Sequence, residues 1–96
     1  MNSTKLLEII GHFNGGTKLY NILRVLELLN LDTEYSNHHS FRVATLRNLN
    51  SLGHKGLLNI DNSYNRIYKI SNKGISILGK IKLWNMIDSE IISKVI

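Results

Sequence analysis

The 96-residue chain contains neither cysteine nor proline. Without cysteine it has no disulfide framework, no thiolate metal site and no cysteine nucleophile. No apolar run approaches the roughly 20 residues needed to span a bilayer. The run Leu6–Ile10 near the start is too short and too interrupted for a signal peptide. We therefore expect an intracellular, cytoplasmic protein that does not enter a membrane, with residues 1–96 forming a single domain.

Patterns that carry enzymatic chemistry are also missing. The sequence has no paired carboxylates, no Ser-His-Asp order and no glycine-rich phosphate loop, so we expect neither enzymatic activity nor a cofactor. Four histidines, His12, His38, His39 and His54, raise the alternative of a metal sensor. Adjacent histidines rarely bind one metal together, and no cysteine or nearby carboxylate set completes a site. We therefore expect no bound metal.

The positive charge of the chain is concentrated in one half. The formal net charge is +5. Between Ser36 and Lys82 the only acidic residue is Asp61, so that segment carries +7 and the remainder −2. Such an asymmetry is typical of a surface that meets a polyanion, although a generally basic, solvated surface is the alternative. The basic residues of this segment are Arg42, Arg47, Lys55, Arg66, Lys69, Lys73, Lys80 and Lys82.

Without proline, the ends of helices have to be read from glycine, asparagine, serine and threonine. Ser3 or Thr4 can cap a first helix that runs to about Phe13. The sequence Asn14-Gly15-Gly16 then stops it, because these residues readily take left-handed backbone conformations.

Two further helices are predicted before residue 53. Thr17 caps a helix that extends to about Leu29, and residues 30–37 form a polar loop. A third helix runs from about His39 to Leu52. Its apolar side consists of Phe41, Thr45, Leu46, Leu49 and Leu52. Its opposite side consists of Ser40, Val43, Ala44, Arg47 and Ser51, which are small or polar.

The second half of the chain predicts a β-hairpin and a last helix. Two short β-like runs, Leu57–Asp61 and Arg66–Ile70, are separated by a polar four-residue turn. Ser71 caps a final helix, residues 71–96, that reaches towards Ile96. The fold class is therefore α+β, mainly α, with three helices, a two-stranded wing and a long C-terminal helix, which is the layout of a winged helix-turn-helix.

Two motifs carry a family resemblance. The stretch Leu49-Asn-Ser-Leu52-Gly-His-Lys-Gly56-Leu57 is followed by Tyr68-Lys-Ile70-Ser71-Asn-Lys-Gly74. Together with Gly16-Thr-Lys-Leu-Tyr20, they resemble the winged-helix transcription regulators of the PadR, MarR and ArsR groups. Small winged-helix proteins of archaeal viruses are similar in size and layout. The resemblance implies that the third helix lies in the major groove and that the wing contacts the neighbouring groove or backbone.

The residue types on these elements fit double-stranded DNA. Arg47 is the best candidate for a bidentate contact to guanine, and small residues permit close approach to bases. The predicted recognition-helix contacts are His39, Ser40, Arg42, Val43, Ala44, Arg47 and Ser51. The predicted wing and backbone contacts are Lys55, Ser63, Tyr64, Asn65, Arg66, Lys69 and Lys73.

The last helix predicts a homodimer. An apolar stripe continues far past the part that a single small domain can cover, and two-fold pairing would present two recognition helices to a palindrome. The expected function is a homodimeric transcriptional regulator, with repression favoured over activation. Packing of the stripe on the first helix of the same chain, a protein-interaction adaptor without DNA contact and an RNA-binding winged helix are the alternatives. The predicted dimerisation residues are Ile81, Trp84, Ile87, Ile91 and Val95.

Overall fold

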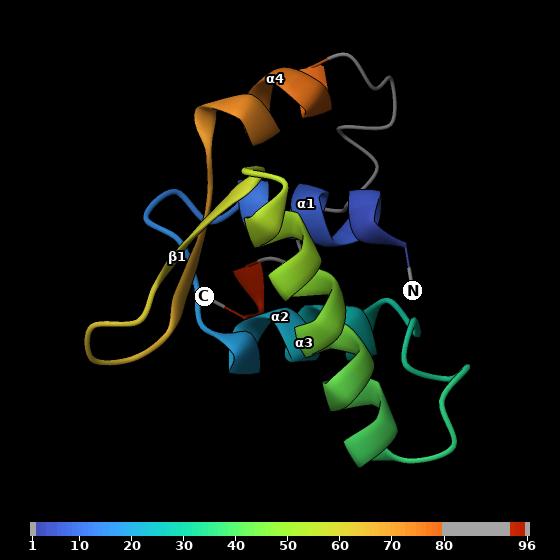
Figure 1. The fold of residues 1–96 in the computed structure, drawn as a ribbon. Coiled ribbons are helices and arrows are strands. Elements are labelled where there is room, and N and C mark those ends of the chain that lie inside the picture. The colour runs from blue at the N-terminus through green and yellow to red at the C-terminus, as the bar shows by residue number, and fades with distance from the viewer. Residues whose placement is uncertain (1, 80–92, 96) are drawn as a thin grey trace.

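A computed structural model describes residues 2–79 and 93–95 of the chain. The described part is α+β and mainly helical, with four helices and a two-stranded antiparallel sheet whose hairpin projects from one side of the helices (Figure 1). The expected last helix is seen from Asn72 to Gly79. Residues 80–92 of its predicted length lie outside the described residues. The elements are α1 (Ser3–Gly11), α2 (Leu19–Leu28), α3 (His38–His54), β1 (Leu58–Asp61), β2 (Ile67–Ile70) and α4 (Asn72–Gly79).

Both predicted N-terminal caps of the first two helices are wrong. In α1 the cap is Asn2, whose side-chain oxygen accepts hydrogen bonds from the backbone N–H groups of Thr4 at 2.9 Å and Lys5 at 3.4 Å. Asparagine serves this position as well as serine does. In α2 the cap is Lys18, which makes no capping bond with its side chain. Thr17 does not act as the cap, because it is held by a different partner.

That partner is the second strand of the hairpin. The N–H of Thr17 donates to the carbonyl oxygen of Tyr68 at 2.8 Å, and the N–H of Tyr68 donates back to Thr17 at 2.8 Å. Gly16 precedes this bridge with a φ of +87°, and a Cβ there would lie 2.9 Å from Ile67 Cγ2 and 3.0 Å from the Tyr68 carbonyl oxygen. Only glycine fits, because it tolerates positive φ and leaves room for the strand.

The core lies between α1, α2, α3 and the inner face of the hairpin. The buried face of α3 carries Phe41, Thr45, Leu49 and Leu52, as predicted, whereas Leu46 is half-buried. The hydroxyl of buried Thr45 donates to the Phe41 carbonyl oxygen at 2.9 Å, which satisfies it within the helix. Completely buried side chains from the other elements include Leu6, Ile9, Ile10, Ile22, Val25, Leu26 and Tyr68.

A second junction fixes the hairpin to α4. The predicted cap at Ser71 is confirmed: its hydroxyl accepts the Gly74 N–H at 3.0 Å and donates to the Gly56 carbonyl oxygen at 2.6 Å. The Ser71 N–H donates to the Leu57 carbonyl oxygen at 3.1 Å. The strands pair in the register Leu58↔Ile70 and Ile60↔Tyr68. One serine therefore joins the exit of α3, the first strand and the start of α4.

We expect Gly74→Ala to lower the free energy of unfolding by roughly 1–3 kcal/mol, as overpacking of a tight contact does. A Cβ at Gly74 would run into the Leu57 carbonyl oxygen and lie 2.8 Å from Ile70 Cγ1. Gly79→Ala is the matched control, because a Cβ at that end of the same helix meets nothing within 4 Å. Denaturant unfolding of the three proteins provides the measurement. Equal stabilities of the two variants would contradict the tight junction.

Candidate nucleic-acid interface

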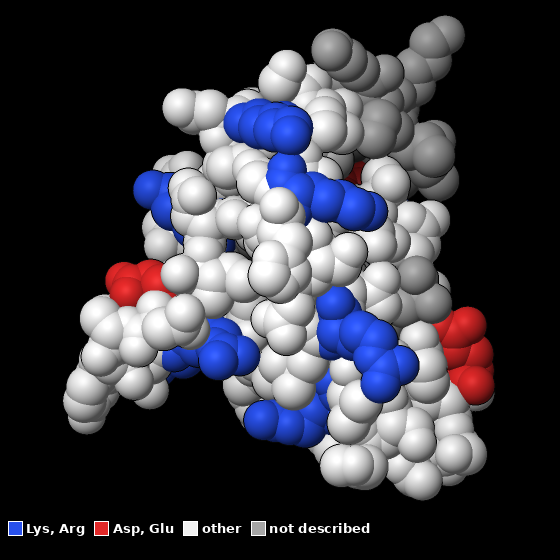
Figure 2. Space-filling model, in the orientation of Figure 1, with Lys and Arg blue, Asp and Glu red and all other residues white. Residues whose placement is uncertain are grey.

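The outer face of α3 is polar and exposed. Four of its exposed side chains lie on the side away from Phe41 and Leu49, namely His39, Arg47, Asn50 and His54. Two more are exposed outside that side: Arg42 at the flank, and His38 at the start of the helix. Figure 2 shows lysine and arginine side chains spread over the face that α3 and the hairpin share, while acidic side chains in this view lie mainly at its edges. The face therefore presents positive charge and hydrogen-bond donors to solvent.

Among the predicted recognition residues, His39, Arg42 and Arg47 are exposed. The start of α1 covers one flank of the helix, where the Ser3 hydroxyl donates to Asn48 Oδ1 at 3.0 Å. This contact shifts the centre of the exposed face towards Arg47 and Asn50. The structure places the other predicted residues at half-buried positions: Ser40, Val43, Ala44 and Ser51.

Sequence reasoning missed Asn50 and His54. Both are exposed, and both line a hollow of about 320 Å³ between the C-terminal half of α3 and the hairpin, together with Asn62 and Arg66. The signal was available, because Asn50 is one helical turn from Arg47 and therefore shares its side of the helix.

Three polar side chains of this face have no partner within the described chain. Arg42, Arg47 and Asn50 make no side-chain hydrogen bond or ion pair within residues 2–79 and 93–95. Elsewhere in the described chain, acidic groups are engaged: Glu8 with Lys5 at 3.1 Å and Glu27 with Arg24 at 3.6 Å. Glu27 also approaches His38 Nδ1 at 4.0 Å. The free charge of the face is therefore positive.

The predicted wing and backbone residues lie on the hairpin, except for Lys55 at the end of α3 and Lys73 in α4. Tyr64 at the turn is 93% exposed. Arg66 is oriented by a hydrogen bond from its Nε to Asn62 Oδ1 at 2.9 Å. The Lys73 ammonium donates to the Lys55 carbonyl oxygen at 3.0 Å. All seven predicted residues are exposed, namely Lys55, Ser63, Tyr64, Asn65, Arg66, Lys69 and Lys73.

Asp61 is the one acidic residue of this basic half, and it is committed to the turn. Its Oδ1 accepts the Ser63 N–H at 2.9 Å. Hydrogen bonds from the backbone N–H and then the hydroxyl of Ser63 lower the pKa of Asp61. The carboxylate therefore remains ionised at neutral pH and shapes the wing turn.

A hollow of about 360 Å³ lies where the start of α2, the flank of α3 and the second arm of the wing, residues 65–68, meet. We call it the α2–α3–wing hollow. Three cationic side chains line it, and no acidic side chain does. Lys18 was not among the residues predicted from the sequence. The lining residues are Lys18, Leu19, Tyr20, Arg42, Leu46, Asn65, Arg66 and Tyr68.

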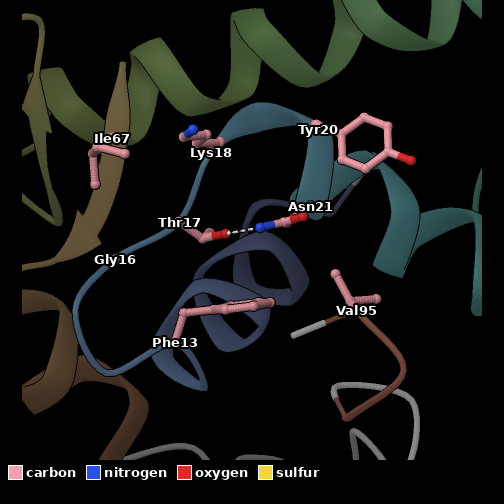
Figure 3. A pocket seen from close by; sticks show the side chains of 8 residues that line it. All are labelled: Phe13, Gly16, Thr17, Lys18, Tyr20, Asn21, Ile67 and Val95. Carbon is pink, nitrogen blue, oxygen red and sulfur yellow. Dashed lines mark hydrogen bonds between the residues drawn. The ribbon is translucent and has the colours of Figure 1, made fainter. Parts of the chain in front are cut away.

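The predicted dimerisation residues fall largely outside the described chain. Ile81, Trp84, Ile87 and Ile91 lie there, and the structure says nothing of them. Val95 is described: it is half-buried and packs against the core of its own chain. It lines a shallow hollow that includes Phe13 and the hydrogen-bonded pair Thr17 and Asn21 (Figure 3).

Residues 2–79 and 93–95 contain no group of three or more histidine, aspartate or glutamate side chains placed to hold a metal ion. No helix among these same residues combines the length and apolarity that crossing a membrane requires.

Comparison with protein-family models found no matching family, and searches of curated proteins and of solved structures found no match.

Proposed function

We propose that the protein binds double-stranded DNA sequence-specifically through a winged helix-turn-helix and regulates transcription as a homodimer, with repression favoured. The observation that carries this proposal is the shared face of α3 and the hairpin. It presents unpaired arginine, lysine and asparagine side chains, while the single acidic residue of that region is bonded into the wing turn. Such a surface complements a polyanion.

The arrangement of elements supports the winged-helix interpretation. Three helices precede a two-stranded hairpin, and the hairpin lies beside α3 (Figure 1). The Thr17–Tyr68 bridge adds the segment between α1 and α2 to the edge of the sheet. A helix entering the major groove and a wing beside it need this side-by-side placement, because both must reach the same duplex.

We expect the side chains at the centre of the exposed α3 face to contact the bases. Arg47 has a free guanidinium that matches the two acceptors of guanine, and Asn50, one turn away, has a free amide that matches adenine. The wing contributes Tyr64 and Lys69 to sugar and phosphate. Base contacts thus come from the helix, and backbone contacts come from the hairpin.

Binding should weaken steeply as salt is raised, since each neutralised phosphate releases counterions. Measured from about 50 to 200 mM salt, the affinity for a selected duplex should fall by orders of magnitude if six or more phosphates are contacted. Fluorescence anisotropy with a labelled duplex provides the measurement. A flat response, or no binding at low salt, would remove the DNA proposal.

Substitutions should separate base reading from backbone contact. Arg47→Ala should cost roughly 1–3 kcal/mol on the best site and relax the preference there, whereas Lys69→Ala should weaken all sequences alike. Sites selected from a random DNA pool, followed by titration of both variants on selected and scrambled duplexes, give the comparison. If Arg47→Ala weakened both duplexes equally, Arg47 would be a phosphate contact.

The homodimer is tested by shortening the chain. The stripe Ile81, Trp84, Ile87 and Ile91 follows helical spacing and would be a large exposed patch in a monomer. We expect the intact protein to dimerise in the micromolar range and a chain ending at Trp84 to be monomeric, with weaker binding to a two-half-site duplex. Sedimentation equilibrium measures both. An intact protein that is still monomeric at about 100 µM, well above that range, would contradict the dimer.

A further inference from the structure

We propose that the α2–α3–wing hollow binds one phosphate group and that the backbone of the duplex supplies it. The inference rests on the proposed DNA binding and deepens it by naming where one phosphate is held. Lys18, Arg42 and Arg66 come from three different elements and line a single hollow of about 360 Å³. Together they would bring a formal charge of +3 around a group that carries one negative charge.

None of these cations is neutralised by a neighbour. Lys18 and Arg42 make no side-chain hydrogen bond or ion pair with the described residues. Arg66 donates one hydrogen bond, from its Nε to Asn62 Oδ1 at 2.9 Å. This bond orients the guanidinium and leaves its terminal nitrogens available. No acidic side chain lines the hollow, so the charged groups in its wall are all positive.

Backbone donors reach the same place. Helix α2 begins at the hollow, and its cap residue Lys18 makes no side-chain capping bond. The first N–H groups of the ten-residue helix, at Leu19 and Tyr20, therefore have no side-chain acceptor. Such groups and the helix dipole favour an anion at this end.

The surroundings favour a phosphodiester of a duplex over a free anion. The hollow is lined by Arg42 on the flank of α3 and by Asn65 in the wing turn, both of which belong to the proposed DNA face. Its remaining walls, Leu19, Tyr20 and Leu46, are apolar or aromatic and suit contact with deoxyribose. A phosphate held here would fix the register in which α3 enters the groove.

Lys18→Gln is the test variant, and Arg24→Gln is its matched control. Both remove one charge from the same end of the chain, but Arg24 is paired with Glu27 and does not line the hollow. Affinity for the selected duplex is measured as a function of salt. The slope of log affinity against log salt should lose about one unit in Lys18→Gln and stay unchanged in the control.

The phosphate itself is located with duplexes in which single phosphates are replaced by neutral methylphosphonates. At one position the affinity difference between wild type and Lys18→Gln should vanish. Unchanged slope and affinity in Lys18→Gln, while wild type binds the duplex, would overturn the site and leave the proposed function standing. Equal melting temperatures of the variants establish that folding is not the cause.

Inorganic phosphate separates the two sources of the ligand. Titrated alone, it should shift the amide resonances of Leu19 and Tyr20 in wild type and not in Lys18→Gln. If this occurred but no methylphosphonate position removed the Lys18 effect, the assignment to the duplex would be overturned in favour of a free anion. If wild type bound no duplex, the proposed function would fail. If, in addition, inorganic phosphate shifted neither the Leu19 nor the Tyr20 amide resonance, the phosphate site in the hollow would be overturned as well.

Discussion

Two backbone hydrogen bonds between Thr17 and Tyr68 hold the hairpin to the helices, and the rest of the candidate interface depends on them. They exist only because Gly16 can take a φ of +87° and lacks a Cβ that would strike Ile67. The bridge fixes the start of α2 next to β2, which is why Lys18 and Arg66 line one hollow. It also buries Tyr68 completely, with its hydroxyl unpaired among the described residues.

The charge pattern follows from how the acidic groups are used. Glu8 and Glu27 are paired with Lys5 and Arg24, which lie on α1 and α2 outside the α3 and hairpin face. Asp61 is held by the wing turn, where hydrogen bonds keep it ionised. The Arg24–Glu27 pair is solvent-exposed and adds little stability, whereas the carboxylate of Glu8 is buried beside Lys5. Glu27 lines a small hollow together with Arg42, but its ion pair is with Arg24. Arg42 and Arg47 form no ion pair with the described residues, so their charge is available to a partner.

The helices and the hairpin were predictable because their apolar periodicity is strong, and Ser71 because its capping sequence is local. The cap at Thr17 was not predictable, since a contact 51 positions away in the chain, with Tyr68, overrides its local preference. The exposed face of α3 was predictable only in part. Its apolar side fixed which residues face inward, but the flank depended on where α1 begins, as the Ser3–Asn48 hydrogen bond illustrates. Asn50 could have been found from its helical spacing to Arg47. Lys18 could not, because its place beside Arg42 and Arg66 depends on contacts between distant segments.

The distribution of exposed apolar side chains bears on the adaptor alternative. An adaptor that recognises another protein needs a contiguous apolar centre surrounded by a polar rim. In the described chain the large exposed apolar residues are Tyr20, Leu31, Tyr64 and Ile75, which lie on α2, the loop after it, the wing turn and α4. Because they are scattered over four elements, none forms such a centre with another on the α3 and hairpin face. Tyr20 instead lines the α2–α3–wing hollow together with Lys18 and Arg42. Under the proposed function, this combination of an aromatic ring and cations would match the sugar and the phosphate of a duplex, because interfaces with DNA are more polar and more positively charged than interfaces between proteins.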